Sequence, residues 1–204
     1  VRSTVNKSEG DLLAALRRFS REGFEATPVS AIASDLGMTK GALYKHYKNK
    51  RDIFDSILAR MEQRDAETAS AFGLPEGTLD EMGDKYRSAA VEAIIGFSRR
   101  QFRYWTEDEF AACFRRMLTL EQHRSAEMTA LYQQYLGSGP LDYTADLLGS
   151  LGYAEPLTLA AKLYAPMFLL YAVYDGSSNK HDVTALADAC LDESERRLLR
   201  DRPQ

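Results

Sequence analysis

Apolar residues recur every three to four positions along most of the chain, the spacing that places them on one face of an α-helix. The first such stretch follows Ser8, a residue type that caps helices, and Gly23 closes it. Thr27 followed by Pro28 predicts the start of a second helix, and Gly37 predicts its end. Because no stretch alternates in the manner of a β-strand, the pattern predicts an all-α fold.

Two more helices are predicted directly after these. Thr39 is expected to cap a short third helix that runs to Tyr47, and Asn49 to cap a fourth helix that reaches residue 71. The four helices carry apolar side chains at helical spacing, which we expect to form one small core. These side chains are Leu12, Leu13, Leu16, Phe19, Ile32, Ala33, Leu36, Leu43, Tyr47, Ile53, Phe54, Ile57, Leu58 and Met61.

The segment 72–77, with the sequence FGLPEG, is the clearest break in the chain. Longer helices are predicted beyond it, at 79–105, 107–120, 124–136, 141–151, 156–174 and 182–199, with turns at 137–140 and 176–179. We therefore predict a small N-terminal domain over 1–50, a linking helix over 50–71, and a second helical domain over 72–204.

Charge is distributed unevenly between these parts. Residues 1–64 carry 12 Lys+Arg and 8 Asp+Glu, whereas residues 65–204 carry 14 and 22. A basic N-terminal part beside an acidic remainder indicates a polyanionic partner for residues 1–64 alone. The two cysteines, Cys113 and Cys190, are too few for a disulfide framework. With no run of about 18 apolar residues, the composition predicts a cytoplasmic protein that does not enter a membrane.

Residues 28–47 read as helix, glycine turn and helix, the arrangement of a helix-turn-helix DNA-binding unit. The side chains of the short helix that are not needed for packing would face outward. At its start, Lys40, Gly41 and Ala42 are predicted to meet base edges in the major groove. Further along, Tyr44, Lys45 and His46 are predicted to meet phosphates. The alternative is a solvated charged face on a small helical domain.

Lys50 is placed in the first turn of the fourth predicted helix. A cation there opposes the helix dipole, while the free N–H groups of that turn favour an anion. A DNA phosphate at this helix end would explain both features, so we predict that Lys50 contacts DNA.

The stretch from Leu12 to Met61 resembles the N-terminal domain of the TetR family of transcriptional regulators. The likeness is carried by Ala14-Ala15, Phe19, Gly23-Phe24, Thr27, Ile32-Ala33, the run LGMTKGALYKHY over 36–47, Asn49-Lys50 and Ile53-Phe54. Tyr47 stands where the family more commonly has Phe, a difference compatible with packing. The resemblance implies DNA contacts by Thr39, Lys40, Gly41, Tyr44, His46 and Lys50, with Thr27 and Ser30 as phosphate contacts. It also implies a C-terminal helical domain that binds an inducer and dimerises through its last two long helices.

The second predicted domain is dense in aromatic and Met residues. A cavity walled by such residues, with a few polar groups, suits a small apolar or aromatic ligand. The predicted ligand-binding residues are Phe97, Gln101, Trp105, Met117, Met128, Tyr132 and Phe168. The alternative is that these residues form an ordinary core.

The predicted helix over 156–174 is apolar on nearly all sides, so it must be buried all round. In a domain of this size, a second copy of the chain is a natural cover for its far side. The predicted dimer interface comprises Leu163, Met167, Leu170, Leu186 and Cys190. The alternative is a central helix inside a monomer.

These observations together predict a transcriptional repressor that binds a two-fold, double-stranded DNA operator as a homodimer and is released by a small molecule. Co-repressor action of that molecule remains an alternative. An enzyme is the main rival class, but His46, His123 and His181 are far apart in sequence. The chain also lacks HExxH, GxSxG, P-loop and GxGxxG motifs. We therefore expect no catalysis, metal or cofactor. A purely structural interaction protein, the third class, would not need the basic residues between Lys40 and Lys50.

Overall fold

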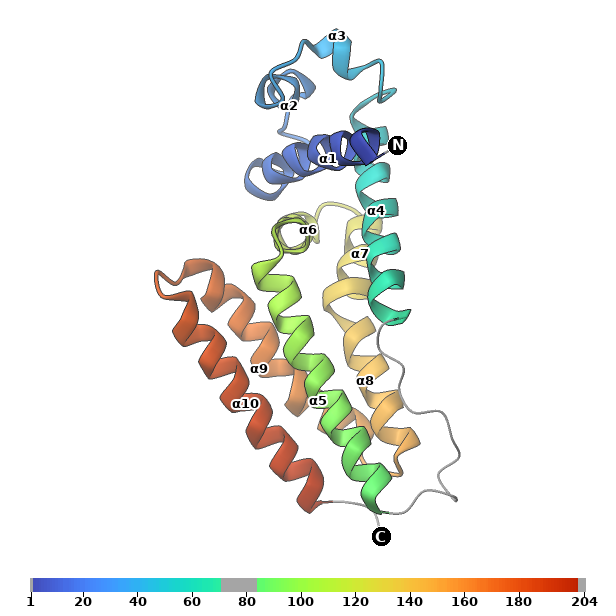
Figure 1. Ribbon diagram of the computed structural model, residues 1–204, viewed down its shortest axis with the longest axis vertical. Helices are drawn as coiled ribbons and strands as arrows, with labels where there is room; N and C mark the ends of the chain where they lie inside the picture. Colours follow the sequence, from blue (N-terminus) through green and yellow to red (C-terminus); the bar gives the residue numbers. More distant parts are fainter. Residues whose placement is uncertain (1, 71–83, 202–204) are drawn as a thin grey trace. The chain divides into compact units, whose positions relative to one another are not determined.

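The computed structural model describes residues 2–70 and 84–201, and the side chains of 9–67 and 90–201. Its helices are α1 (Arg2–Glu22), α2 (Val29–Asp35), α3 (Lys40–Leu43), α4 (Lys50–Ser70), α5 (Asp84–Glu107), α6 (Glu109–Glu121), α7 (Ala126–Leu136), α8 (Ser138–Ser150), α9 (Pro156–Gly176) and α10 (Lys180–Arg200) (Figure 1). No β-strand occurs within the described ranges, so the predicted all-α fold is confirmed.

The start of α2 differs from the prediction. The helix begins at Val29, and Pro28 stands at the position before it without a side-chain cap. The Thr27 hydroxyl instead donates to the carbonyl of Gly23 at 2.7 Å. A Thr hydroxyl can bond to nearby backbone in a turn as well as at a helix end. Here it bonds within the turn and does not cap α2.

The start of α3 is as predicted, because Thr39 Oγ1 accepts a hydrogen bond from the backbone N–H of Ala42 at 3.1 Å. The regular helix ends at Leu43 rather than Tyr47, although the N–H of Tyr47 still donates to the carbonyl of Leu43 at 3.1 Å. Asn49 caps α4 as predicted, since its Oδ1 accepts from the N–H of Asp52 at 2.9 Å.

Other boundaries shift by a few residues. α1 begins at Arg2, before Ser8, and 138–140, predicted as part of a turn, forms the start of α8. The predicted break at 72–77 and the first residues of the helix predicted from 79 lie outside the described residues.

The chain divides into two compact units, of which the first comprises the described parts of 1–71 and 109–132. Within this unit α1 packs against α2, α4 and α6, and α2 packs against α3. The largest buried side chains of its core are Leu16, Phe19, Ile32, Leu43, Ile53, Phe54, Ile57, Met61, Phe114 and Met117. Most predicted core residues are therefore buried, whereas Leu13, Leu36 and Leu58 are only partly covered.

Asp65 of α4 belongs to this unit and carries a perturbed carboxyl group. Burial, with a smaller contribution from Glu62, raises the pKa of Asp65 to about 6, against the lowering effect of Arg64. The folded chain thus binds this proton more tightly than the unfolded chain does. Stability associated with Asp65 is therefore lost as the pH rises from the unfolded pKa through the folded one.

We expect Asp65→Asn to stabilise the protein near neutral pH and to have little effect in acid. The gain near pH 7 should be about 1 kcal/mol, because part of the carboxyl group still meets water and screens the penalty. Urea unfolding at about pH 7 and about pH 4 measures it. Asp55→Asn is the matched control, since exposed Asp55 is paired with Arg51 at 2.7 Å. An equal gain at both pH values would contradict the prediction.

The second unit comprises the described parts of 72–108 and 133–204. Within it, α9 packs against α8 and α10, and α5 packs against α9 and α10. The α9–α10 pair forms an antiparallel hairpin (Figure 1). Phe102 of α5 stacks on Tyr171 of α9 with ring centroids 5.5 Å apart. Arg103 of α5 donates to Asp188 of α10 at 2.8 Å, so both apolar and charged contacts hold α5 in place.

By length and composition α9 could cross a membrane, with a mean hydropathy of 1.4 over 18 residues. One such helix is weak evidence, because the core helix of a soluble protein passes the same test. Only 28% of that window is buried within the chain. Much of the apolar surface of α9 is therefore left uncovered by the described residues.

Candidate DNA-binding surface

The turn between α2 and α3 is built on Gly37, whose φ of 65° lies in the left-handed region that favours glycine. The N–H of Gly37 donates to the carbonyl of Ser34, and the N–H of Met38 to that of Ala33, both at 3.0 Å. These bonds close the C-terminal end of α2. The turn thereby directs the chain into α3, whose Leu43 is buried against the first unit's core.

The side chains of α3 and the residues just after it divide into two sets. Leu43 and Tyr47 are buried, as predicted. The exposed set comprises Lys40, Gly41, Tyr44, Lys45 and His46, with Ala42 partly exposed and with Thr39 and Ser30 exposed beside it. The ammonium of Lys40 stands 5.6 Å from the ring centroid of Tyr44. The Lys40 cation and the Tyr44 ring thus lie together on the exposed side of α3.

Two predicted DNA contacts are turned inward instead. Thr27 is only 1% exposed, and its hydroxyl donates to the carbonyl of Gly23. Lys50 Nζ donates to the carbonyls of Phe24, Glu25 and Thr27, at 2.7, 2.9 and 3.3 Å. We therefore remove Thr27 and Lys50 from the proposed DNA contacts, because their polar atoms are occupied within the protein.

Sequence reasoning missed the role of Glu121, the last residue of α6. Its carboxylate is 2% exposed and accepts a hydrogen bond from the backbone N–H of Phe24 at 3.0 Å. The ring of Phe24 lies edge-on to Phe19 and to Phe54, each at 5.2 Å between centroids. The turn between α1 and α2 is thus held by α6 as well as by the core.

Ion pairs add further links within the first unit. Arg17 of α1 pairs with Glu109 of α6 at 2.7 Å, and Arg51 of α4 pairs with Glu127 of α7 at 2.5 Å. Hydrogen bonds from these arginines hold the pKa of Glu109 and of Glu127 below its usual value. Because all four side chains are well exposed, each pair contributes little to stability and serves mainly to orient the helices.

The seven predicted ligand-binding residues are distributed over both units. Met117, Met128 and Tyr132 belong to the first unit, and Phe97, Gln101, Trp105 and Phe168 to the second. Met117, Met128, Tyr132 and Trp105 are buried, Phe97 and Gln101 are partly exposed, and Phe168 is exposed. Burial raises the pKa of Tyr132. Burial suits a core as well as a cavity wall, so this ligand site stays a prediction.

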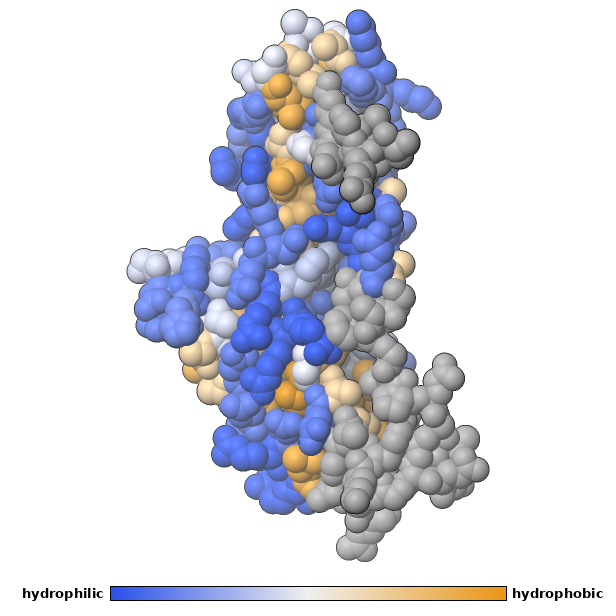
Figure 2. Space-filling model, in the orientation of Figure 1, coloured by the Kyte–Doolittle hydropathy of each residue, from blue (hydrophilic) through white to orange (hydrophobic). Residues whose placement is uncertain are grey.

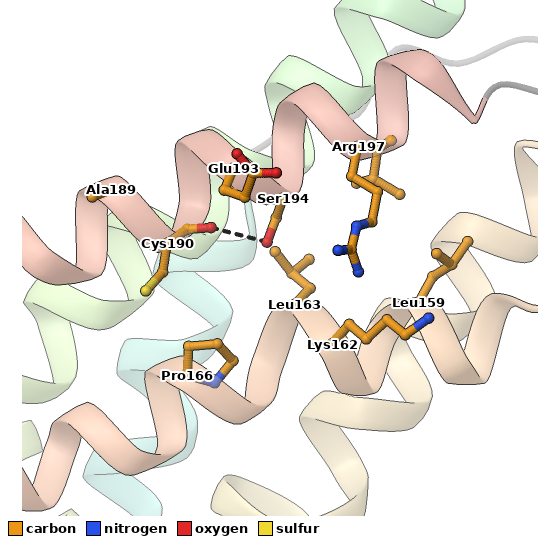
Figure 3. Close-up of a pocket in the computed structure, with 10 residues that line it drawn as sticks. Leu159, Lys162, Leu163, Pro166, Ala189, Cys190, Glu193, Ser194 and Arg197 are labelled. Atoms are coloured by element: carbon orange, nitrogen blue, oxygen red, sulfur yellow. Dashed lines mark hydrogen bonds between the residues drawn. The ribbon is translucent and has the colours of Figure 1, made fainter.

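A groove of about 350 Å³ lies between α9 and α10 (Figure 3). Leu159, Leu163 and Pro166 of α9 form one side of it. The head groups of Lys162 and Arg197, from opposite helices, point into the same space in Figure 3. The groove therefore has a largely apolar lining, and its polar groups are these two cations together with Glu193 and Ser194 of α10.

The predicted dimer interface needs correction on α9. Leu163, Met167 and Leu170 are covered by the chain's own helices and are at most 4% exposed. The exposed apolar residues of this hairpin are Leu157, Phe168, Leu169, Val173 and Leu186, which we call the α9–α10 apolar face. In Figure 2 apolar surface lies along the outer edge of the second unit below the α9–α10 turn, while the α10 surface toward the viewer is largely hydrophilic. Leu186 and Cys190, also predicted, are exposed and partly exposed.

Comparison with known proteins finds similarity centred on the N-terminal helices. The family model for bacterial regulatory proteins, tetR family, matches residues 12–57. The chain is 46% identical over 43 residues to the HTH-type transcriptional regulator AcrR of Shigella flexneri, covering 21% of this chain and 20% of AcrR. It is 30% identical over 108 residues to the HTH-type transcriptional repressor AcnR of Corynebacterium efficiens, covering 53% and 56% of the two chains. The chain thus spans about a fifth and about half the length of these relatives.

A solved structure shows the same fold. SmeT, the repressor of the Stenotrophomonas maltophilia multidrug efflux pump SmeDEF, matches with a TM-score of 0.61 at 22% identity. The match covers 93% of this chain and 89% of SmeT. At this identity the likeness shows the fold alone, an all-α fold.

The helices α1 to α4, with the exposed start of α3, define a helix-turn-helix domain. Residues 12–57 of this domain match the tetR family model, which confirms the resemblance seen in the sequence.

Proposed function

We propose that the chain is a DNA-binding transcriptional repressor of the cytoplasm, acting by binding rather than by catalysis. The observation that carries this proposal is the exposed set around α3, with Lys40, Tyr44 and Lys45 on the outer side of a TetR-family helix-turn-helix. A recognition helix places the side chains of its first turn in the major groove and those further along near phosphates. We also propose the predicted division of the chain into a DNA-binding domain over 1–50, a linking helix over 50–71 and a second domain over 72–204.

DNA binding should respond differently to two lysine substitutions. Lys45→Ala should weaken binding to all duplexes and reduce the slope of log affinity against log salt by about 0.9, because one phosphate contact is lost. Lys40→Ala should cost about 1–3 kcal/mol on a selected duplex and relax the preference at one base position. Fluorescence anisotropy on a selected and a random duplex, over a range of salt, measures both.

Arg200→Ala is the control for this experiment, since Arg200 is an exposed cation of α10, in the other unit. It should leave the affinity and the salt slope unchanged. If the wild-type protein bound every duplex weakly and without dependence on salt, the repressor proposal would be wrong, and a structural interaction protein would be the better description.

We propose a homodimer whose interface is the α9–α10 apolar face. A second copy is the expected occupant, because only 28% of the apolar 18-residue window of α9 is buried within the chain, and exposed apolar patches mark interaction sites. The groove next to this face offers depth for side chains of the partner. A two-fold dimer would also place two α3 segments for successive turns of a two-fold operator.

We further propose that a small apolar or aromatic ligand in the C-terminal domain releases the DNA. Support comes from chain connectivity and from the bond at the end of α6. Asp108 alone separates α5 from α6, and α6 ends at Glu121, whose carboxylate binds the turn before α2. A shift of α5 on ligand binding would therefore act on that turn through α6. By linkage, the ligand and the operator would weaken each other's binding by the same factor.

A further inference from the structure

The ammonium of Lys50 occupies a closed position in the first unit. Its three N–H donors face three carbonyls, those of Phe24, Glu25 and Thr27, at 2.7 to 3.3 Å. It also lies 4.6 Å from the ring centroid of Phe24 and 3.9 Å from the Glu25 carboxylate. An ammonium has only three donors, so each is matched to an acceptor inside the protein.

This position differs from what a phosphate contact requires. The side chain of Lys50 is 22% exposed, and to bind a phosphate its ammonium would have to leave these three carbonyls. These ion-dipole contacts also explain why a cation stands in the first turn of α4, where it opposes the helix dipole. The ammonium in the first turn of α4 is stabilised by carbonyls of another segment, so no bound anion is needed to explain its presence.

Lys50 joins the segment before the helix-turn-helix to the segment after it. Residues 24–27 lead into α2, and Lys50 follows the recognition segment at the start of α4. One side chain therefore fastens the entry of the segment 28–49 to its exit. The same turn is held from another side by Glu121 and by the Thr27 hydroxyl, which satisfy the Phe24 N–H and the Gly23 carbonyl.

We propose that Lys50 is a positioning residue for DNA binding: by tying residues 24–27 to the start of α4 it fixes the pose of α3, and it makes no phosphate contact. This inference rests on the proposed DNA-binding function.

The test compares Lys50→Met, Lys50→Arg and the control Lys45→Met. Met keeps the stem on the Phe24 ring but removes the charge and the donors. Arg keeps the charge, but its planar fork cannot aim three donors at carbonyls that surround one nitrogen. Melting is measured without DNA, and binding is measured over a range of salt. The two probes are a random duplex and a duplex that the wild-type protein selects from a random pool.

For a positioning residue, both Lys50 variants should melt about 4 °C or more below the wild type, because charge-assisted hydrogen bonds are lost. Well below melting, their preference for the selected duplex over the random one should fall about tenfold, the equivalent of one such bond. The salt slope on random DNA should not change. Lys45→Met should instead melt like the wild type and lose about 0.9 from the slope.

The opposite pattern would overturn the proposal: Lys50→Met melting like the wild type with a reduced slope, and Lys50→Arg binding normally. If Lys50→Met did not fold, reduced preference in Lys50→Arg would still support the proposal and wild-type preference would refute it. If the wild type bound no DNA, the proposed function would fail, while the melting comparison would still decide whether Lys50 holds the turn.

Discussion

Leu169→Glu should convert the proposed dimer into a monomer. Leu169 is 63% exposed on α9, in the middle of the α9–α10 apolar face. In a two-fold interface each substitution occurs twice, and each buries a carboxylate among apolar side chains. Because an unpaired buried charge costs several kcal/mol, the dimer dissociation constant should rise by about a thousandfold or more. Sedimentation or light scattering at several protein concentrations measures the change.

DNA affinity should fall with the dimer. A monomer presents one recognition segment to one half-site, so the affinity for a selected two-fold duplex should drop by about a hundredfold or more. Leu120→Glu is the matched control, since Leu120 is also an exposed leucine but lies on α6. It should leave the oligomeric state unchanged. A wild-type monomer would favour the alternative of a central helix inside a monomer. A dimer that persists in Leu169→Glu would show that the interface lies elsewhere.

The α9 helix also shows how far its sequence pattern could predict structure. The position of the helix was predictable because an apolar run of this length requires burial. The side of the helix that packs against α8 and α10 was not predictable, because apolar residues surround the helix and no polar face marks the side that meets solvent. Leu163 and Leu169 are chemically identical, yet Leu163 is buried and Leu169 is exposed. Only packing against the neighbouring helices separates the inner residue from the outer one.

The helix-turn-helix was predictable for the opposite reason. Between residues 28 and 47 the buried and exposed positions alternate at helical spacing, and Gly37 marks the turn, so local pattern alone assigns Leu43 inward and Lys40 outward. The hydrogen bonds of Thr27 and Lys50 within the protein could not be predicted in this way. Lys50 bonds to backbone carbonyls 23 to 26 residues away, which the chain brings close only after folding. The Thr27 hydroxyl bonds to the carbonyl of Gly23, four residues before it, instead of capping α2. Such contacts leave no periodic signal in the sequence.

Gly23→Ala should destabilise the first unit far more than an ordinary surface substitution. Gly23 has a φ of 86°, which costs an alanine about 1–2 kcal/mol. Its new Cβ would also stand 2.6 Å from Glu121 Oε1. The carboxylate can swing away, but doing so leaves the N–H of Phe24 without its acceptor, at a further cost of about 1–3 kcal/mol. We expect a total loss of about 2–5 kcal/mol in urea unfolding, a large part of a typical stability.

Gly37→Ala is the matched control, because Gly37 also has a positive φ, of 65°, yet nothing lies within 4 Å of the position of an added Cβ. Gly37→Ala should lower the free energy of unfolding by the backbone strain alone. In a Glu121→Ala background, Gly23→Ala should become as mild as Gly37→Ala, whereas Gly37→Ala should keep its cost. A coupling of about 1–3 kcal/mol between positions 23 and 121 is therefore expected. Equal costs for the two alanines in the wild-type background would show that Glu121 yields freely. The end of α6 would then have no firm hold on the turn that leads into the helix-turn-helix.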